Sequence, residues 1–250
     1  MRPEELLEMR ELEDHYWWFV SRRRTVLRLL DRLDLGPYAE LLDGGCGTGA
    51  LLVELGSRGH AHGADVSRDA LRLTAQRGAG RLVCSDLQQL AFRDGSFHVL
   101  LSADVLEHVE DDQRALAELG RVAKVGGHII ITVPALDILW GPHDEALRHR
   151  RRYSPRRLRA LARGAGLEVK VLSYGLVLLF PLALLLRSAQ RLSHRLRPRA
   201  PTTGIVALPP WANRLASWLM AQEERLVGRV PLPWGVSLVA VLRKPGRPMV

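Results

Sequence analysis

The chain has 250 residues, of which 47% are hydrophobic, and a formal net charge of +9. That length suits one globular domain with a complete hydrophobic core. Two cysteines, Cys46 and Cys84, are too few for a disulfide framework or a four-ligand zinc site, which favours a reducing, cytoplasmic location. The first ten residues lack the apolar run of a secretory signal, so none is expected.

The positive charge is concentrated in one part of the chain. Residues 146–222 contain 15 basic residues and one acidic residue, Glu168, whereas residues 1–145 contain 16 basic and 24 acidic residues. An arginine-rich genome would scatter arginine over the whole surface, but it would not remove the acidic residues from one stretch. The block therefore indicates an anionic partner.

The N-terminal segment reads as helical. Residues 4–34 have apolar side chains at helical spacing and include an aromatic cluster at 16–19, and Gly36-Pro37 ends the segment. From residue 40 onward, short apolar runs alternate with helical patterns, which predicts crossover connections and a mostly parallel sheet with helices on both faces. The expected strands are 40–43, 60–65, 81–85, 97–103, 128–133, 167–174 and 236–243, and the expected helices are 49–58, 67–77, 111–123, 154–163 and 211–229.

The interval between the last two strands is too long for an ordinary loop. Its first part, residues 174–186, is apolar apart from Tyr174 and contains Pro181, and its 13 residues are too few to span a bilayer. This insert is a lid, an interfacial membrane contact or an oligomer interface such as a dimer contact, and the sequence leaves the three open. The basic residues that follow it favour anionic lipid and comprise Arg187, Arg191, His194, Arg195, Arg197 and Arg199.

A glycine-rich run, ELLDGGCGTG, occupies residues 40–49 at the end of the first expected strand. Glycine lets the backbone approach a ligand closely, and the following helix offers free N–H groups. The segment 45–50 also fits the G-x-G-x-x-[GA] pattern of dinucleotide-binding proteins. The loop alone therefore does not decide the cofactor.

Acidic residues follow three successive strands and point to one crevice above the sheet. Asp43 ends the first strand, and Asp65 ends the second, where a carboxylate can accept both ribose hydroxyls. Asp86 follows the third, where it can accept from an exocyclic amine. A pyrophosphate would gain nothing from Asp43 beside the loop, whereas a cofactor with a cationic amino-acid end would tolerate it.

Residues 41–49 resemble the first motif of the class I S-adenosylmethionine-dependent methyltransferases. The sequence is most similar to their small-molecule branch, methyltransferase type 11, which is related to quinone-biosynthesis methyltransferases. The resemblance covers 40–134 closely and 10–175 loosely, with two departures, His98 for an acidic residue and Val125 for a proline. The later segments that carry it, in order, are GADVS at 63–67, CSDL at 84–87, FRDGSF at 92–97, DVLEHV at 104–109 and ELGRVAKVGG at 118–127.

The resemblance implies an α/β fold: a Rossmann-like, seven-stranded, mostly parallel sheet of order 3-2-1-4-5-7-6, with the last strand antiparallel. One domain would span 1–250, with a helical cap (1–36), a cofactor-binding core (37–174), the apolar and basic insert (175–234) and a final strand and tail (235–250). It also implies S-adenosylmethionine as the cofactor, and no metal is expected.

The cofactor contacts are carried over from the family's motifs. The glycines would wrap the cofactor, Asp43 would lie by its methionine end and Asp65 would hold the ribose. Asp86 and Leu87 would meet the adenine, and Asp104 would line the methionine portion. The full set is Asp43, Gly45, Cys46, Gly47, Gly49, Asp65, Val66, Asp86, Leu87, Ala103 and Asp104.

Methyl transfer requires a nucleophile held about 3 Å from the methyl group, and an oxygen or nitrogen nucleophile must also lose a proton. The candidates for catalysis are Asp104 and His108, which follow strand four, and His143 and His149 in the loop at 140–153. Their alternatives are that Asp104 positions a ligand, that His108 with Glu107 caps a helix, and that the loop histidines are solvated.

The loop at 140–153 concentrates titratable groups, which is unusual for a loop without a task. We expect it to bind the acceptor, with the arginines at 150–152 contacting an anionic group unless they form a solvated face. Two tryptophans of the N-terminal segment would form a lid, or simply pack on the core. The expected acceptor-binding residues are Trp17, Trp18, His143, Asp144, Arg150, Arg151 and Tyr153.

The sequence thus predicts a methyltransferase that acts by in-line displacement on a small lipophilic or anionic acceptor, related to lipids, quinones or glycans. Peripheral association with an anionic membrane, at its inner surface, is the expectation from the insert. An RNA or other nucleic-acid methyltransferase fits the arginine block. That alternative is disfavoured because strand four lacks a following Asn/Asp-Pro-Pro-aromatic motif. An NAD-dependent oxidoreductase is the other alternative.

Overall fold

The structure is a computed structural model that describes residues 3–196 and 208–246, with side chains described for 5–189 and 208–246. Seven strands form one sheet in the order β3-β2-β1-β4-β5-β7-β6. The strand β7 is antiparallel to both of its neighbours, and the other pairs are parallel. The predicted fold is confirmed. The strands are β1 Glu40–Gly44, β2 His60–Asp65, β3 Leu82–Cys84, β4 Phe97–Ala103, β5 Ala123–Pro134, β6 Glu168–Gly175 and β7 Ser237–Arg243.

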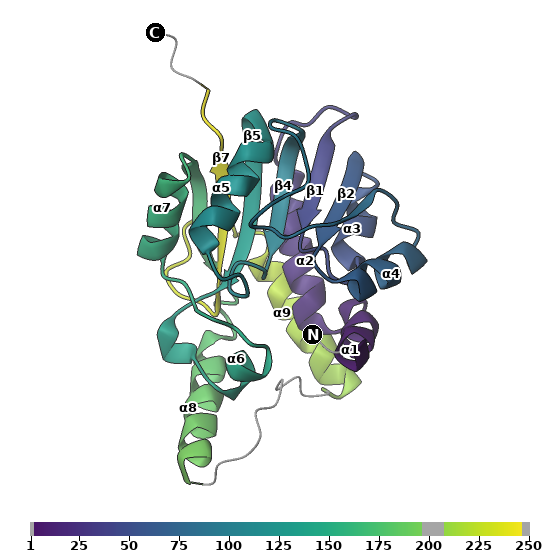
Figure 1. Ribbon diagram of the computed structural model, residues 1–250. Helices are drawn as coiled ribbons and strands as arrows, with labels where there is room; N and C mark the ends of the chain where they lie inside the picture. The colour runs from purple at the N-terminus through teal and green to yellow at the C-terminus, as the bar shows by residue number, and fades with distance from the viewer. Residues whose placement is uncertain (1–2, 197–207, 247–250) are drawn as a thin grey trace.

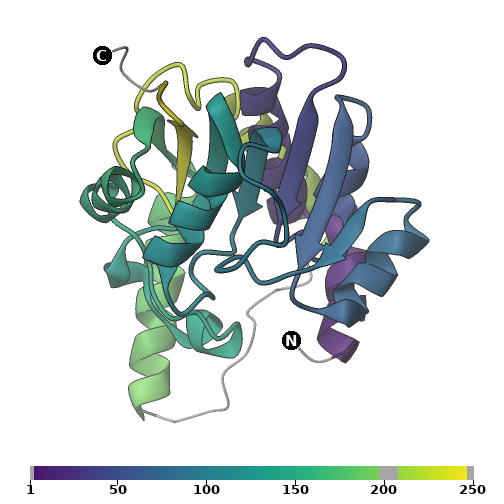
Figure 2. The same ribbon diagram turned by 45° about the horizontal axis from the view of Figure 1, so that its top comes forward.

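Helices cover both faces of this sheet (Figures 1 and 2). Alternate residues of the strands face opposite sides, so Leu42 and Leu100 pack in one cluster, and Leu41 and Leu101 in the other. The first cluster includes leucines of α5 and α7, and the second includes leucines of α2 and α3. The helices are α1 Pro3–Glu13, α2 Trp17–Leu30, α3 Ala50–Leu55, α4 Arg68–Gln76, α5 Asp112–Val122, α6 Pro142–Ala146, α7 Pro155–Gly164, α8 Phe180–Leu196 and α9 Pro210–Glu223, with a short 3₁₀ helix at Asp137–Leu139.

The N-terminal cap is two helices rather than one. Leu12 accepts backbone hydrogen bonds from His15 and Tyr16, at 3.2 and 2.8 Å, and this turn separates α1 from α2.

Two expected helix starts are present, since Ser67 accepts from the Ala70 N–H and Ser154 from the Arg157 N–H. The last predicted helix is too long, because α9 ends at Glu223.

The long interval between β6 and β7 contains α8 and α9, and Pro181 lies in the first turn of α8, where it disturbs no helical hydrogen bond. Both helices lie at the lower end of the molecule in Figure 1, with α1 and α6. Within the described chain, no helix is both long and apolar enough to cross a membrane. Of the predicted basic flank, Arg187 is described, and the side chains of Arg191, His194, Arg195, Arg197 and Arg199 lie outside the described residues.

Candidate cofactor and acceptor site

The site lies at the carboxyl ends of the parallel strands, where loops from β1, β2 and β4 meet. The glycine loop follows β1 and leads into α3. Gly45, Gly47 and Gly49 all have left-handed backbone conformations, with φ of 83°, 55° and 88°. A Cβ on Gly45 would lie 2.4 Å from Val105, and one on Gly49 would lie 2.6 Å from Thr74. The loop therefore requires glycine for its own geometry as well as for ligand approach.

Asp65 ends β2 and faces this loop. Its Oδ2 accepts from the Gly47 N–H at 2.9 Å, and its Oδ1 accepts from the Ser67 N–H at 2.8 Å. The carboxylate thus joins the glycine loop to the start of α4. A ribose held here would share this carboxylate with the two backbone amides.

Asp43 ends β1 and is almost fully buried. Burial, and then the nearby Asp65 and Glu13, raise the pKa of Asp43 to about 7. Three carboxyl groups beside one glycine loop make a site that repels a pyrophosphate and attracts a cation. The residues present therefore fit S-adenosylmethionine, which carries a sulfonium and an ammonium group, better than a dinucleotide.

The adenine side of the expected site is more open. The carboxylate of Asp86 accepts from the Gln88 N–H at 2.8 Å, and Leu87 is buried beside the backbone of Gly44. Val66 is exposed, whereas Cys46 is buried and its thiol pKa is raised by that burial. Cys46 therefore contributes packing, and its backbone N–H donates to the Ala64 carbonyl of β2 at 3.1 Å.

The N-terminal cap covers the glycine loop, a contact that sequence reasoning missed. Glu13 at the end of α1 accepts a hydrogen bond from the Thr48 hydroxyl, and Arg77 donates to the Thr48 carbonyl at 2.9 Å. The Met9 methyl group lies 3.4 Å from where a Cβ on Gly47 would stand. The pairing of an acidic residue near the end of the first helix with Thr48 leaves no periodic signal in the sequence.

Asp104 follows β4 at the reactive end of the expected site, and Ala103 before it is half-buried. The backbone φ of Asp104 is 55°, an uncommon conformation for a residue with a side chain. Thr132 donates to Oδ1 at 2.9 Å, and Arg22 of α2 forms an ion pair with Oδ2. Each oxygen thus has a partner within the protein, which favours a positioning role for Asp104, and its role in removing a proton stays a prediction.

Beyond Asp104, the structure brings together Glu107, His108 and His149. Their ligating atoms lie within 4.8 Å of one another, and the two imidazole rings are 4.8 Å apart between centroids. The prediction that Glu107 and His108 begin a helix is wrong, because the residues between β4 and α5 form turns. Burial, and then Asp104, raise the pKa of Glu107. Loss of solvation around the ring, and then His149, lower the pKa of His108 to about 4, although the residue as a whole is exposed.

His149 is held in place by Asp144. The two side chains meet at 2.9 Å, and Asp144 also accepts from Arg152 at 2.9 and 3.0 Å. The burial of Asp144 alone would raise its pKa, but the His149 hydrogen bond and the Arg152 charge outweigh it and lower the pKa to about 2. His143 lies on the other side, with its ring centroid 6.1 Å from that of His149.

Several expected acceptor contacts are instead supports of the loop at 140–153. Asp144 and Tyr153 are fully buried, and Tyr153 donates to the Leu106 carbonyl at 3.0 Å. Arg151 pairs with Asp112 at 3.1 Å, and Arg150 donates to the His108 carbonyl at 3.2 Å. Asp144 and Tyr153 are too deeply buried to contact an acceptor, which corrects that expectation, whereas the expectation for Arg150 and Arg151 stays a prediction.

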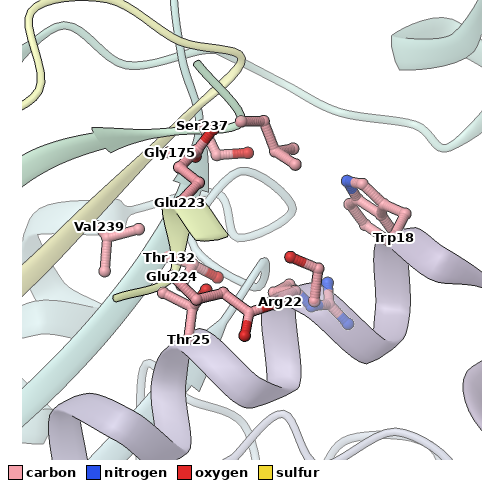
Figure 3. Close-up of a pocket in the computed structure, with 11 residues that line it drawn as sticks. Trp18, Arg22, Thr25, Thr132, Gly175, Glu223, Glu224, Ser237 and Val239 are labelled. Atoms are coloured by element: carbon pink, nitrogen blue, oxygen red, sulfur yellow. The ribbon is translucent and has the colours of Figure 1, made fainter. Parts of the chain in front are cut away.

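A small cavity of about 30 Å³ lies between α2 and the sheet, next to the Asp104 pair (Figure 3). Trp18 lines it, as expected for an acceptor-side residue, and lies over Arg22 at 4.6 Å from ring centroid to guanidinium carbon. Trp17 does not line it, and its backbone N–H donates to Asn213 of α9 at 2.9 Å. The other lining residues are Ser21, Arg22, Thr25, Thr132, Gly175, Leu176, Glu223, Glu224, Ser237 and Val239.

Two of these residues, Glu223 and Glu224, were not anticipated. Glu223 accepts from the backbone amides of Val177 and Leu178, at 2.8 and 3.0 Å, and so fastens the start of the insert to α9. Glu224 is 2% exposed and lies 3.5 Å from Arg28. Burial raises the pKa of Glu224, against the opposing effects of Ser21, Arg24 and Arg28. Glu223 ends α9 and Glu224 follows it, in a stretch where the sequence offered no motif.

Comparison with known proteins shows what the chain is similar to. Residues 42–131 match the model of the family described as "Methyltransferase domain". Over this segment the chain is similar to class I methyltransferases. A solved S-adenosylmethionine-dependent methyltransferase from Thermotoga maritima has the same fold as this chain, with a TM-score of 0.59 at 19% identity over 96% of this chain and 97% of that one.

Two curated relatives illustrate the range of proteins with this core. Malonyl-[acyl-carrier protein] O-methyltransferase of Herminiimonas arsenicoxydans is 35% identical over 136 residues, which cover 52% of each chain. Probable tRNA methyltransferase 9B of Homo sapiens is 35% identical over 104 residues, which cover 40% of this chain and 22% of the relative. The chain therefore spans from about a fifth to about half of the length of these relatives.

Proposed function

We propose that this protein transfers the methyl group of S-adenosylmethionine to a small acceptor with an apolar portion. The observation that carries the proposal is the glycine loop flanked by Asp43 and Asp65 and followed, across the crevice, by Asp104. This arrangement leaves the acceptor side between α2, the loop at 140–153 and the insert. The residues of the chain bind and orient the reactants, and in-line displacement at the methyl carbon follows from that positioning.

The cavity beside Asp104 supports an acceptor that reacts through an uncharged group. Burial raises the pKa values of Glu223 and Glu224, so an anionic group at that depth would find no cation there other than Arg22 among the lining residues. Its volume of about 30 Å³ is far below the roughly 300 Å³ of a typical small-molecule site. We infer that the cap or the insert moves when an acceptor enters, and that Trp18 covers the acceptor afterwards.

The exposed apolar side chains of the insert support a lipophilic acceptor at a membrane surface. On α8, Leu182 and Leu185 are 53% and 67% exposed, and on α9, Trp211 and Trp218 are 66% and 60% exposed. These helices lie at the same end of the molecule as the cap (Figure 1). Apolar and aromatic side chains near basic residues are typical of proteins that lie on anionic membranes. We favour this reading over a lid or a dimer contact.

A nucleic-acid acceptor is the rival proposal, because one relative is a probable tRNA methyltransferase and the segment 146–222 is rich in arginine. Of the arginines that the sequence assigned to an anionic ligand, however, Arg152 is buried and Arg151 is paired with Asp112. Arg151 and Arg152 therefore offer little free charge to a phosphate backbone, whereas Arg148 and Arg150 are exposed.

A methyl-transfer screen tests the proposal. The full chain is incubated with S-adenosylmethionine labelled in its methyl group and with separate lipid, quinone, glycan and RNA fractions. We expect label in a fraction extracted by organic solvent, and that label should be absent with the Asp65→Ala variant. Label confined to RNA would support the rival, and the absence of transfer to every fraction would count against the proposed activity.

A further inference from the structure

We propose that Glu107, His108 and His149 form a binding site for a divalent transition-metal ion at the acceptor side of the methyltransferase core. The three side chains come from two segments far apart in the sequence, and their ligating atoms lie within 4.8 Å of one another. Ligands of a bound ion, each about 2.1 Å from the metal, would be separated by at most about 4.2 Å. Small side-chain movements would therefore complete the site.

The carboxylate of Glu107 is the strongest indication. Glu107 is 1% exposed, and apart from its own backbone amide neither of its oxygens has a hydrogen-bond partner among the described residues. A buried carboxylate without partners is costly, and proteins retain such groups where a cation or proton offsets the charge. Arg22 and Arg152 act on Glu107 electrostatically but form no hydrogen bond with it. A metal ion would supply the missing partner.

His149 is oriented as metal-ligating histidines usually are. Its Nδ1 lies 2.9 Å from the buried carboxylate of Asp144, which leaves Nε2 to bind an ion. A carboxylate behind the imidazole fixes the tautomer and raises the basicity of the ligating nitrogen. Arg152 in turn holds Asp144 in place. The support behind this histidine is therefore built before any ion binds.

The two segments that carry the ligands are tied together. The Arg150 N–H donates to the Glu107 carbonyl at 2.8 Å, and the Arg150 Nε donates to the His108 carbonyl at 3.2 Å. Tyr153 donates to the Leu106 carbonyl at 3.0 Å. These contacts on the backbone of three successive residues fix the positions of the ligands. They also explain why so many polar groups of the loop at 140–153 form hydrogen bonds within the protein.

One carboxylate and two imidazoles suit Zn²⁺, Mn²⁺ or Fe²⁺, and three protein ligands leave positions open for another ligand. This inference rests on the proposed function, which places the acceptor next to Asp104. An acceptor hydroxyl bound at an open position would lose its proton to bulk water more readily, because the metal lowers its pKa. The oxygen would then attack the methyl carbon as the carbon–sulfur bond breaks, giving the methyl ether and S-adenosylhomocysteine.

The test is metal binding by the full, untagged chain, stripped with chelator and titrated with ZnCl₂ and MnCl₂ by calorimetry, with Co²⁺ absorption as a second readout. We expect about one ion per chain. Glu107→Gln and His108→Ala should each weaken binding by about 100-fold or more, since loss of a direct ligand should exceed the effect of losing an outer-shell partner. His108 is exposed, so its replacement should leave the fold intact even where the buried Glu107→Gln variant does not.

The matched control is His60→Ala, at the opposite end of the strands, where His60 pairs with Glu40 at 2.9 Å. Its metal affinity should equal that of the original chain. Failure of the original chain to bind any of the three ions, or equal affinity in all variants, would overturn the inference. S-adenosylmethionine binding is measured on the same samples. Cofactor binding without metal binding would reject the metal site alone, whereas metal binding without cofactor binding would reject the proposed function.

Discussion

Arg22 of the N-terminal cap forms an ion pair with Asp104 at the end of β4. Asp104 stands in a left-handed backbone conformation and is also bound by Thr132, so three elements meet at this one carboxylate. The N-terminal cap therefore contributes a residue, Arg22, to the expected reactive end of the site as well as covering it. An acceptor that enters beside Trp18 would lie next to the Arg22–Asp104 pair. Binding of the acceptor and movement of the cap would therefore be coupled.

Tyr153→Phe tests whether Tyr153 supports the loop or binds the acceptor. Its hydroxyl is buried and bonded to the Leu106 carbonyl and to Asp112, both at 3.0 Å. Removing the hydroxyl should lower the free energy of unfolding by about 1–2 kcal/mol. S-adenosylmethionine affinity should change little. Chemical denaturation and calorimetry measure the two quantities.

The matched control is Tyr38→Phe, since Tyr38 is 77% exposed and should not affect stability. Unchanged stability of the Tyr153 variant, together with a large rise in the KM for the acceptor, would contradict the supporting role.

Asp43 should make the stability of the cofactor-free protein depend on pH. Burial, then Asp65 and Glu13, raise its pKa from 3.8 to about 7 in the folded state, while Arg22 opposes the shift. The folded state thus holds a proton that the unfolded state releases between about pH 4 and 7. The stabilisation from this proton is complete below pH 4 and is lost as the pH rises through 7.

Asp43→Asn removes this dependence. The variant should become more stable relative to the original chain as the pH rises from about 4 to 7, by on the order of 3 kcal/mol, with no further change above that range. Denaturation curves at several pH values measure the difference. A difference that is constant over this range would show that Asp43 is ionised in the folded state throughout.

Sequence reasoning predicted the strand order and most strand boundaries because buried parallel strands and their crossover helices leave strong periodic patterns. It also located the glycine loop, whose composition follows from its backbone angles. It missed Glu13, Arg22 and Glu224, because their contacts join segments that are distant in the chain. The same limit applies to the loop at 140–153, where composition indicated a task but did not separate the buried support Asp144 from the ligand candidate His149.

The insert provides a test of membrane association. Leu182→Glu combined with Leu185→Glu places two charges on exposed positions of α8 and should strongly reduce cosedimentation with vesicles containing anionic lipid. Stability should be unaffected because neither side chain is buried. The matched control adds the same two negative charges at exposed, uncharged polar positions, Ser57→Glu and Gln76→Glu, which tests the effect of charge alone. Equal binding by all three proteins would exclude this face as the membrane contact.

The central claim is that the crevice above β1 and β2 binds S-adenosylmethionine, and direct calorimetric titration tests it most simply. We expect the chain to bind about one S-adenosylmethionine and not NAD⁺. Asp65→Ala should bind S-adenosylmethionine at least about 10-fold more weakly, since a charge-assisted hydrogen bond contributes about 1.5–3 kcal/mol. Asp69→Ala, an exposed acid on α4, should bind like the original chain. Binding of NAD⁺ without binding of S-adenosylmethionine, or unchanged affinity in Asp65→Ala, would contradict the account.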